Sequence, residues 1–306
     1  MLQILEPGIL TTIQDCGRNG YQQFGVTRGG AMDVLALRAA NALLGNEAGD
    51  AAIEIASSGL RARALEKCVV AVAGAPYALC VHERIAPCNA ALFLRAGEVL
   101  ACDAPAWGRY AYLAVHGGFD VPRVLGSRAT ARRDGFGGFN GRALQAGDVL
   151  RATRDACPME RAGKMLSEKF ARYYSSDAPL RVIWGPHAEF FDDAAREEFL
   201  RGEYHISDLS DRMGTRLKGA AIPRKEDELL SCGVTRGAIQ IPPDGQPIVL
   251  QADHQTAGGY PILATVIRAD IPRLAQKRAD ELVIFEPTTM DAAREAWREL
   301  VELECG

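Results

Sequence analysis

The sequence predicts a mainly β protein with a few helices, and three observations lead to this class. Short segments rich in valine, alanine and leucine recur between glycine and proline residues, as they do in β-sheet proteins. Two similar turns, RAGEVL at 95–100 and QAGDVL at 145–150, each place glycine before an acidic residue and a strand, an arrangement repeated in closed barrels and sandwiches. Amphipathic helical patterns are readable in only three places.

The expected strands are the apolar segments between these turns. In chain order they cover 68–73, 90–94, 110–115, 180–184, 248–250 and 282–285. A further pair of apolar runs, 239–242 and 247–250, flanks the turn PDG and predicts a hairpin. We expect this hairpin to end in a site-forming loop, because TAGGYP follows it and supplies glycines where backbone must approach something closely.

Three helices are expected, and the C-terminal one has the clearest pattern. They cover 33–44, closed by Gly45 and Asn46, then 188–200, closed by Gly202, and finally 291–303. The last helix places its apolar side chains on one face, with Thr288 and Asp291 available as caps; these side chains are Ala292, Ala296, Trp297, Leu300 and Val301. It is expected to pack against a barrel.

The chain is expected to contain two domains. The segment 151–178 is richer in charge than its flanks and lacks their strand pattern, so the boundary is placed there. This gives a first β domain over 1–155, a linker over 156–178 and a second β domain over 179–306 with the C-terminal helix. The pentapeptide GVTRG occurs both at 25–29 and at 233–237, which suggests that the two halves are related.

Composition excludes several classes of function. The 306 residues are 48% hydrophobic and 24% charged, which is ordinary for a soluble globular protein. A formal net charge of −4 gives no reason to expect a nucleic acid or an anionic membrane as a partner. No apolar run approaches a membrane span and the N-terminus lacks a signal-peptide pattern, so we expect a cytoplasmic protein. The eight cysteines form no CxxC pair and are expected to be free thiols.

Two glycine-rich clusters in the first half could meet a ligand. In GVTRGGAMD at 25–33, backbone amides beside Arg28 and Asp33 could bind one, or Asp33 could simply cap the following helix. In the cluster at 125–141, Arg128 precedes a loop where an anion could sit. The glycine spacing there fits neither a dinucleotide fingerprint nor a P-loop, so nucleotide binding by this chain is disfavoured.

Two polar clusters follow in the second half. In SDLSDRMGTRLKG at 207–219, Arg212 beside Asp211 could clamp a carboxylate or phosphate, or belong to a solvated salt-bridged turn. The stretch 237–261 is the densest in polar groups, and in it His254 beside Asp253 suits general acid–base work. A structural histidine is the alternative, since a lone histidine is a weak signal. The five histidines have no HxH or HExxH spacing, so no metal site is expected.

The sequences of these four clusters resemble those of the biotin-dependent carboxyltransferase family, also known as allophanate hydrolase subunit 2. Its motifs are matched in order by GVTRGGAMD, GSRATARRDGFGGFNGR, SDRMGTRLKG and GAIQIPPDGQPIVLQADHQTAGGYP. In bacteria the family looks like the C subunit of the ATP-dependent 5-oxoprolinase, and it is similar to KipA-like antagonists of a sporulation-kinase inhibitor and to part of urea carboxylase. The resemblance implies a fold of two tandem cyclophilin-like β-barrels, in agreement with the strand-rich pattern.

The resemblance also implies the site residues. The catalytic candidates are Asp253, His254 and Arg212. The substrate-binding candidates are Gly29, Gly30, Met32, Asp33, Arg128, Asp211, Met213, Gln240, Gln255, Thr256, Gly259 and Tyr260. The family often has arginine or histidine where His254 stands, which favours binding of a carboxylate over an obligatory proton shuttle. This chain departs from the family pattern at Thr27-Arg28, where prolines are frequent, and at Ala257.

The function implied by the resemblance is that of one component of a hydrolase complex. It would help open the lactam of 5-oxoproline to give glutamate, with Arg128 or Arg212 as the clamp for the substrate carboxylate. The expected partners are a KipI-like homologue, of the kind called subunit 1 or the B subunit, and the large A subunit. No lysine lies in a biotin-attachment context, so ATP, and biotin if it is used, would be carried by partner subunits. The alternatives are the carboxyltransferase half of a urea carboxylase-type system and a KipA-like regulatory binding protein.

Overall fold

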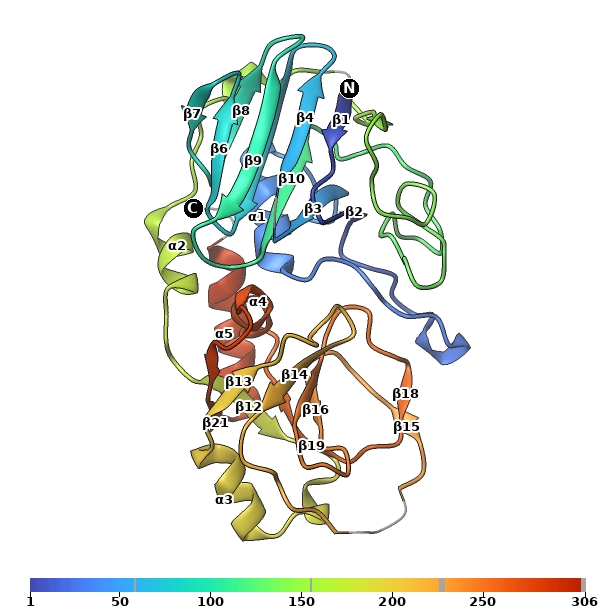
Figure 1. The fold of residues 1–306 in the computed structure, drawn as a ribbon, viewed down its shortest axis with the longest axis vertical. Coiled ribbons are helices and arrows are strands. Elements are labelled where there is room, and N and C mark those ends of the chain that lie inside the picture. Colours follow the sequence, from blue (N-terminus) through green and yellow to red (C-terminus); the bar gives the residue numbers. More distant parts are fainter. Residues whose placement is uncertain (58, 155, 226–228, 304–306) are drawn as a thin grey trace. The chain divides into compact units, whose positions relative to one another are not determined.

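The computed structural model describes residues 1–57, 59–154, 156–225 and 229–303. The chain divides into two compact units (Figure 1). The first unit comprises Met1–Asn19, Gly29–Tyr174 and the chain from Val301, and the second comprises Gly20–Arg28 and Ser175–Leu300. No helix in the described part of the chain is long and apolar enough to cross a membrane.

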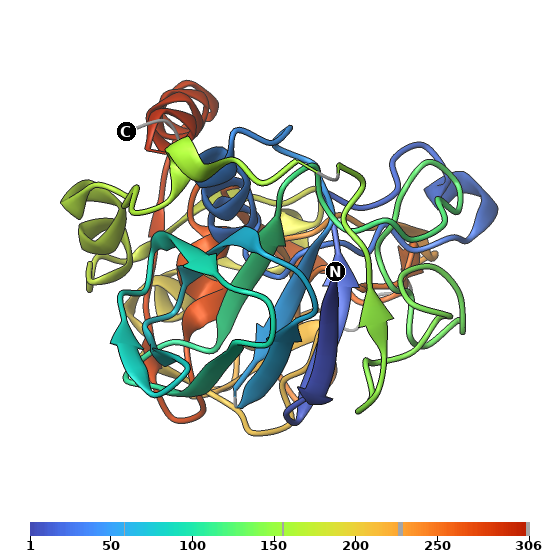
Figure 2. The ribbon, with the colours of Figure 1, turned by 90° about the horizontal axis from the view of Figure 1, so that it is seen from above.

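The first unit is built from two antiparallel sheets around one core (Figure 2). A six-stranded sheet has the order β11-β1-β4-β9-β6-β7, and a five-stranded sheet has the order β2-β3-β10-β5-β8. The strands of the first sheet are β1 (Leu2–Glu6), β4 (Leu60–Ala64), β6 (Tyr77–Val81), β7 (Arg84–Ala86), β9 (Val99–Pro105) and β11 (Val149–Leu150). Those of the second are β2 (Leu10–Gln14), β3 (Ala52–Ala56), β5 (Cys68–Gly74), β8 (Ala90–Leu94) and β10 (Tyr110–Val115).

The two turns with similar sequence are the same structural device. Gly97 has a φ of 86° and Gly147 a φ of 93°, in the left-handed region that favours glycine. The acidic residue that follows each glycine accepts a hydrogen bond from the backbone three residues earlier, at 2.8 Å in both turns. Strands β9 and β11 then begin at the next residue, as the sequence predicts.

Helix α1 (Val34–Leu44) covers β5 and β10 of the first unit. Its alanines allow close approach to the sheet, and it ends at Gly45, which is left-handed with a φ of 69°. The segment expected to be a linker contains a 3-10 turn, η2 (Met159–Arg161), and a helix, α2 (Glu168–Tyr174), and its Phe170 is fully buried. This part of the chain therefore packs into the first unit up to Tyr174.

The second unit is a nearly closed barrel. Its eight strands have the order β20-β13-β14-β17-β16-β19-β12-β21, so the first and last strands of the sheet follow one another in the chain. They are β12 (Leu180–Trp184), β13 (Tyr204–Ile206), β14 (Gly214–Lys218), β16 (Ala238–Gln240), β17 (Ile248–Leu250), β19 (Ile262–Val266), β20 (Leu282–Val283) and β21 (Phe285–Pro287). The mainly β class with few helices is confirmed, and so is the predicted hairpin, since β16 pairs with β17.

The helices of the second unit differ in detail from the sequence prediction. Helix α3 (Asp193–Arg201) begins five residues later than predicted, because Asp192 caps it and the residues before it form η3 (Ala188–Phe190). Helix α5 (Met290–Glu302) receives its cap contact from Thr289 rather than from Thr288 or Asp291. The remaining elements are α4 (Ile271–Gln276), which was not predicted, the 3-10 turn η1 (Gln22–Phe24), and a small ladder of β15 (Cys232–Gly233) with β18 (Ala257–Gly258).

Candidate functional site

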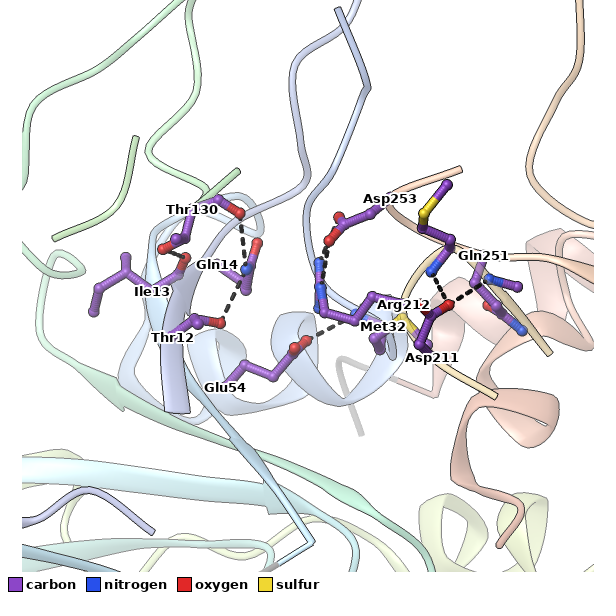
Figure 3. A network of polar contacts seen from close by, with 12 residues as sticks. Thr12, Ile13, Gln14, Met32, Glu54, Thr130, Asp211, Arg212, Gln251 and Asp253 are labelled. Carbon is purple, nitrogen blue, oxygen red and sulfur yellow. Dashed lines mark hydrogen bonds and ion pairs between the residues drawn. The ribbon is translucent and has the colours of Figure 1, made fainter. Parts of the chain in front are cut away.

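An arginine–carboxylate pair joins the third and fourth sequence clusters within the second unit (Figure 3). Arg212 donates from Nε to one oxygen of Asp253 at 2.8 Å and from a terminal nitrogen to the other at 2.9 Å. The backbone amide of Asp253 also donates to the carbonyl of Arg212 at 2.8 Å. Because both side chains are mostly buried, this two-pronged pair fixes the loop before β14 to the loop after β17.

His254, the next residue, is held as a neutral imidazole. Its side chain is only 2% exposed, and Nδ1 lies 2.6 Å from the carbonyl oxygen of Gln255. A carbonyl only accepts, so Nδ1 carries the proton and Nε2 has a free lone pair. Burial, followed by the positive charges of Arg236 and Arg28, lowers the pKa of His254 from its usual 6.5. The arrangement offers a proton acceptor at Nε2.

The two copies of GVTRG contribute one arginine each to the surroundings of His254. Arg28 and Arg236 occupy the same position in the repeat, and both act electrostatically on the imidazole. The glycine that follows each of them is left-handed, with a φ of 62° at Gly29 and 87° at Gly237. Two guanidinium groups near a neutral histidine create a positive potential that suits a carboxylate ligand.

Gln251 links Arg236 to the barrel. Its side chain is completely buried, its amide nitrogen donates to the hydroxyl of Thr215 on β14 at 2.9 Å, and its amide oxygen accepts from Arg236 at 3.5 Å. Its backbone amide also donates to the carbonyl of Met213. Gln251, which directly follows β17, thereby orients Arg236.

Two further amides support the carbonyl that fixes the His254 ring. Gln255 donates from its side chain to the oxygen of Gln240, which is 2% exposed, at 3.2 Å, and Gln240 in turn reaches the carbonyl of Tyr260 at 3.5 Å. Gly258 lies directly against this pair. A Cβ added there would be 2.5 Å from Nε2 of Gln240, so the amide pair requires glycine at this position.

Gly258→Ala is expected to destabilise the chain by about 1–3 kcal/mol, because the added methyl group overpacks a buried amide contact. Urea unfolding measures this loss. Gly233→Ala in the partner strand β15 is the matched control, since a Cβ there meets nothing within 4 Å, and it should leave the midpoint unchanged. Equal stability of the two variants would contradict the close packing at Gly258.

The other candidates of the second unit have backbone or peripheral positions. Asp211 is exposed and accepts from the amides of Met213 and Gly214 at 2.8 and 3.1 Å, which forms the tight turn into β14. Thr256 accepts from the amide of Val234 through its carbonyl. Gly259 and Tyr260 are exposed, and the tyrosine side chain, at 44% exposure, is open to a ligand or a neighbouring chain.

In the first unit, Asp15 draws the first two sequence clusters together. Its carboxylate accepts from the hydroxyl of Ser127 at 2.7 Å and from the amide of Arg128 at 2.6 Å, and its carbonyl accepts from the amide of Ala31. A Cβ at Gly30 would be 2.9 Å from that carbonyl, so close backbone approach explains the glycine. The start of the cluster at 125–141 is also tied to β2, where the hydroxyl of Thr130 donates to the carbonyl of Ile13 (Figure 3).

Arg128 is engaged within the first unit. Its Nε donates to the carbonyl of Val121 at 2.8 Å, and its terminal nitrogen pairs with Asp120 at 3.2 Å. The side chain is 18% exposed. In the described structure Arg128 therefore braces its own loop, as Arg212 braces the loop of Asp253.

Asp33 and Met32 belong to a buried network around α1. Asp33 is completely buried, caps the helix by accepting from the amide of Ala36, and accepts from the hydroxyl of Tyr174 at 2.7 Å. The capping alternative for Asp33 is thus confirmed. The amide of Met32 donates to Glu54 at 2.8 Å, shown in Figure 3, and burial raises the pKa of Tyr174 well above its usual 10.

Sequence reasoning placed His254, Asp253, Arg212, Gln240 and Gln255 in one site, and the structure brings these five together in the second unit. It did not select Arg28, Arg236, Gln251 or Thr215. The repeated pentapeptide was the available signal for the two arginines, because repetition of TRG sets both in the same local backbone. No group of three or more histidine, cysteine or acidic side chains within the described ranges could hold a metal ion.

Comparison with known proteins places this chain in a family. The sequence profile of the carboxyltransferase domain, subdomain A and B, matches residues 24–287. The chain belongs to this carboxyltransferase family. It is 37% identical to the 5-oxoprolinase C subunit of Escherichia coli over 300 residues, which cover 97% of this chain and 94% of that protein. Its identity to the 5-oxoprolinase C subunit of Haemophilus influenzae is also 37%, over 298 residues.

More distant carboxyltransferase relatives are parts of much larger proteins. Urea amidolyase of Lachancea kluyveri is 28% identical, and the match covers 96% of this chain but 17% of that protein. The crystal structure of the Kluyveromyces lactis urea amidolyase superposes on this whole chain with a TM-score of 0.90 at 26% identity, and the match covers 20% of that chain. The urea carboxylase of the same yeast gives a TM-score of 0.88 at 27% identity over 29% of its chain.

Proposed function

We propose that this chain is the C subunit of an ATP-dependent 5-oxoprolinase, which hydrolyses 5-oxo-L-proline to L-glutamate. The near full-length match to two proteins of that name supports the proposal. The feature of the site that supports it best is the positive charge of Arg236 and Arg28, which acts on the buried His254 and, after burial, lowers its pKa. The substrate carries one carboxylate and one lactam, and this site combines positive charge with a neutral proton acceptor.

The residues have separate roles in this proposal. Arg28 and Arg236 bind the substrate carboxylate. The sequence prediction gave this role to Arg128 or Arg212, but each of these two side chains braces its own loop. Nε2 of His254 accepts the proton of the water that attacks the activated lactam carbonyl, and the ring nitrogen takes up a proton as the C–N bond breaks. Arg212 and Asp253 position the loop, and Gln251 orients Arg236.

ATP is bound by partner subunits in this proposal. The matching relatives are named as subunits, which implies other chains in their complexes. For this chain the proposed partners are a homologue of the B subunit and a large A subunit that activates the lactam. The chain by itself is then inactive.

The test is glutamate release from 5-oxoproline and ATP by the reconstituted complex, with and without this chain. Turnover should require the chain, and Arg236→Gln should raise KM by about tenfold or more, as expected for loss of a charge-assisted carboxylate contact. Arg216→Gln is the control, because Arg216 is exposed on β14 and lies outside the Gln251 contact. Full turnover without the chain would refute the proposal.

Carboxyl transfer from biotin carried by another chain is the second candidate. The superposition on urea amidolyase over the whole chain favours it. The same arginines would then bind a carboxylated group. Transfer of labelled bicarbonate to an acceptor by a complex with a biotin-bearing partner, without glutamate formation, would support this candidate over the first.

A further inference from the structure

A cavity of about 900 Å³ opens at one end of the first unit. It lies where β1 and β5 begin and where β10 and β11 end, so strand ends of both sheets surround it. The mouth of a β-barrel is a frequent place for ligands, and small-molecule sites have volumes of roughly 300–1,000 Å³. All residues that line the cavity belong to the first unit, whereas His254 lies in the second.

The floor of the cavity is apolar. Leu2, Val69, Phe119 and Leu150 line it, and each of these side chains is 1% exposed. They come from β1, β5, the turn after β10, and β11, and Leu2, Phe119 and Leu150 belong to the core cluster beneath the cavity. The apolar surface that the cavity itself exposes comes from half-buried lining residues such as Cys68 and Ala152. The remaining lining residues are mostly polar, which matches the usual composition of a ligand site: an apolar bed with a few polar groups that orient the ligand.

The rim of the cavity carries an excess of positive charge. Its two carboxylates already have partners: Glu66 pairs with the N-terminal amino group at 2.7 Å, and Asp120 pairs with Arg128 at 3.2 Å. Three cations of the lining, Lys67, Arg151 and Arg154, have side chains that form no hydrogen bond or ion pair with any described residue. Arg151 acts electrostatically on Glu66, and Arg154 acts on Asp50, which lies outside the lining.

A histidine adds a hydrogen-bonding group to this wall. His116 follows β10 and lines the cavity, and its Nδ1 is buried without a hydrogen-bond partner among the residues that the structure describes. A buried polar atom of this kind costs free energy unless a ligand or solvent satisfies it. A ligand oxygen in the cavity would satisfy it.

We propose that this cavity binds a small organic anion, a carboxylate with an apolar body, as a second ligand site separate from that of His254. The guanidinium groups of Arg151 and Arg154 take the carboxylate, since arginine matches its two oxygens with paired donors. The half-buried Cys68 and Ala152 of the lining contact the apolar body. The inference stands on the cavity and its charges, and it does not depend on the 5-oxoprolinase proposal.

The test is calorimetric titration of the full-length chain with benzoate. Benzoate should bind saturably, while benzamide, which has the same shape without the charge, and inorganic phosphate, which lacks the apolar body, should each bind at least about tenfold more weakly. Binding of phosphate or benzamide as tight as that of benzoate would overturn the proposed ligand class.

Variants locate the binding. Arg151→Ala/Arg154→Ala should weaken benzoate binding about tenfold or more. Lys169→Ala/Arg172→Ala removes the same charge from exposed positions on α2 of the same unit and should leave the affinity within about twofold. Arg236→Gln removes a proposed carboxylate contact of the His254 site, so it should abolish any benzoate binding there and keep the binding that depends on Arg151 and Arg154. No loss of benzoate binding in the Arg151/Arg154 variant, or loss of all benzoate binding in Arg236→Gln, would overturn the proposal. The four residues exchanged for alanine are exposed, so unfolding does not confuse the comparison.

Discussion

Replacing His254 with glutamine is expected to lower kcat for glutamate release by the reconstituted complex by about 10²–10⁴-fold, the usual contribution of a positioned general base. Glutamine retains a donor for the carbonyl of Gln255 and a similar volume, but it has no group that accepts a proton near neutral pH. The loss should therefore fall on kcat, whereas Arg236→Gln should act mainly on KM.

His205→Gln is the matched control for this experiment. His205 lies in the same unit, also bonds a backbone carbonyl through Nδ1, in this case that of Asp280 at 2.9 Å, and is exposed. Its replacement should leave kcat unchanged. A His254→Gln complex that keeps more than about a tenth of the parental kcat would exclude His254 as the base and leave it a role in binding.

The pH dependence gives a second readout of the same residue. Burial and the two arginines lower the pKa of His254 below 6.5, so the base stays active in mildly acidic solution and the acid limb of kcat/KM should lie below pH 6.5. The free energy of unfolding also decreases as the pH falls. Below pH 6.5 the unfolded chain takes up a proton that the folded chain still excludes, so this contribution is lost as the pH falls through the lowered pKa. His254→Gln should remove that part of the acid dependence.

Uninterrupted apolar strands were the most predictable part of the fold, whereas β1 to β4, which contain polar residues, were not predicted. Apolar runs such as β8 and β10 have the bounds that the sequence predicts, because almost every side chain in them is buried and no polar residue interrupts the run. Helices were less predictable where a cap decides their start. Helix α3 starts after Asp192, whose side chain caps it by accepting from the amide of Ala195 at 2.8 Å. The residues before Asp192 form only a 3-10 turn.

Helix α4 illustrates what a local pattern cannot show. It has six residues, all of them buried, and proline at its start, so no amphipathic period distinguishes it from a strand. The site has the same limitation. Arg212 and Asp253 are 41 residues apart, and only the barrel brings them together. The sequence analysis named both residues and predicted that Arg212 would bind a substrate carboxylate. That Arg212 instead pairs with Asp253 depends on tertiary structure.

Asp270 provides the largest expected effect on stability. Its side chain is completely buried at the start of α4, where it accepts from the backbone and both ends of the guanidinium of Arg181 at 2.7–3.0 Å and pairs with Arg273 at 3.2 Å. The carboxylate thus joins β12 to α4. Asp270→Ala removes the acceptor and leaves two arginines without it, which should cost about 3–5 kcal/mol.

Urea unfolding in a Trp107→Phe background would measure this loss, because Trp184 and Trp297 then report on the second unit alone. Asp208→Ala, which breaks an exposed pair with Lys218 in the same unit, is the control and should have no measurable effect. Adding Arg181→Met to Asp270→Ala should recover part of the loss, since it removes one uncompensated charge and keeps an apolar stem. If the free energy of unfolding of Asp270→Ala lies within about 1 kcal/mol of the parental value, the carboxylate does not hold β12 to α4. The apolar contacts of α4, whose Leu274 is 1% exposed, then hold β12 and α4 together.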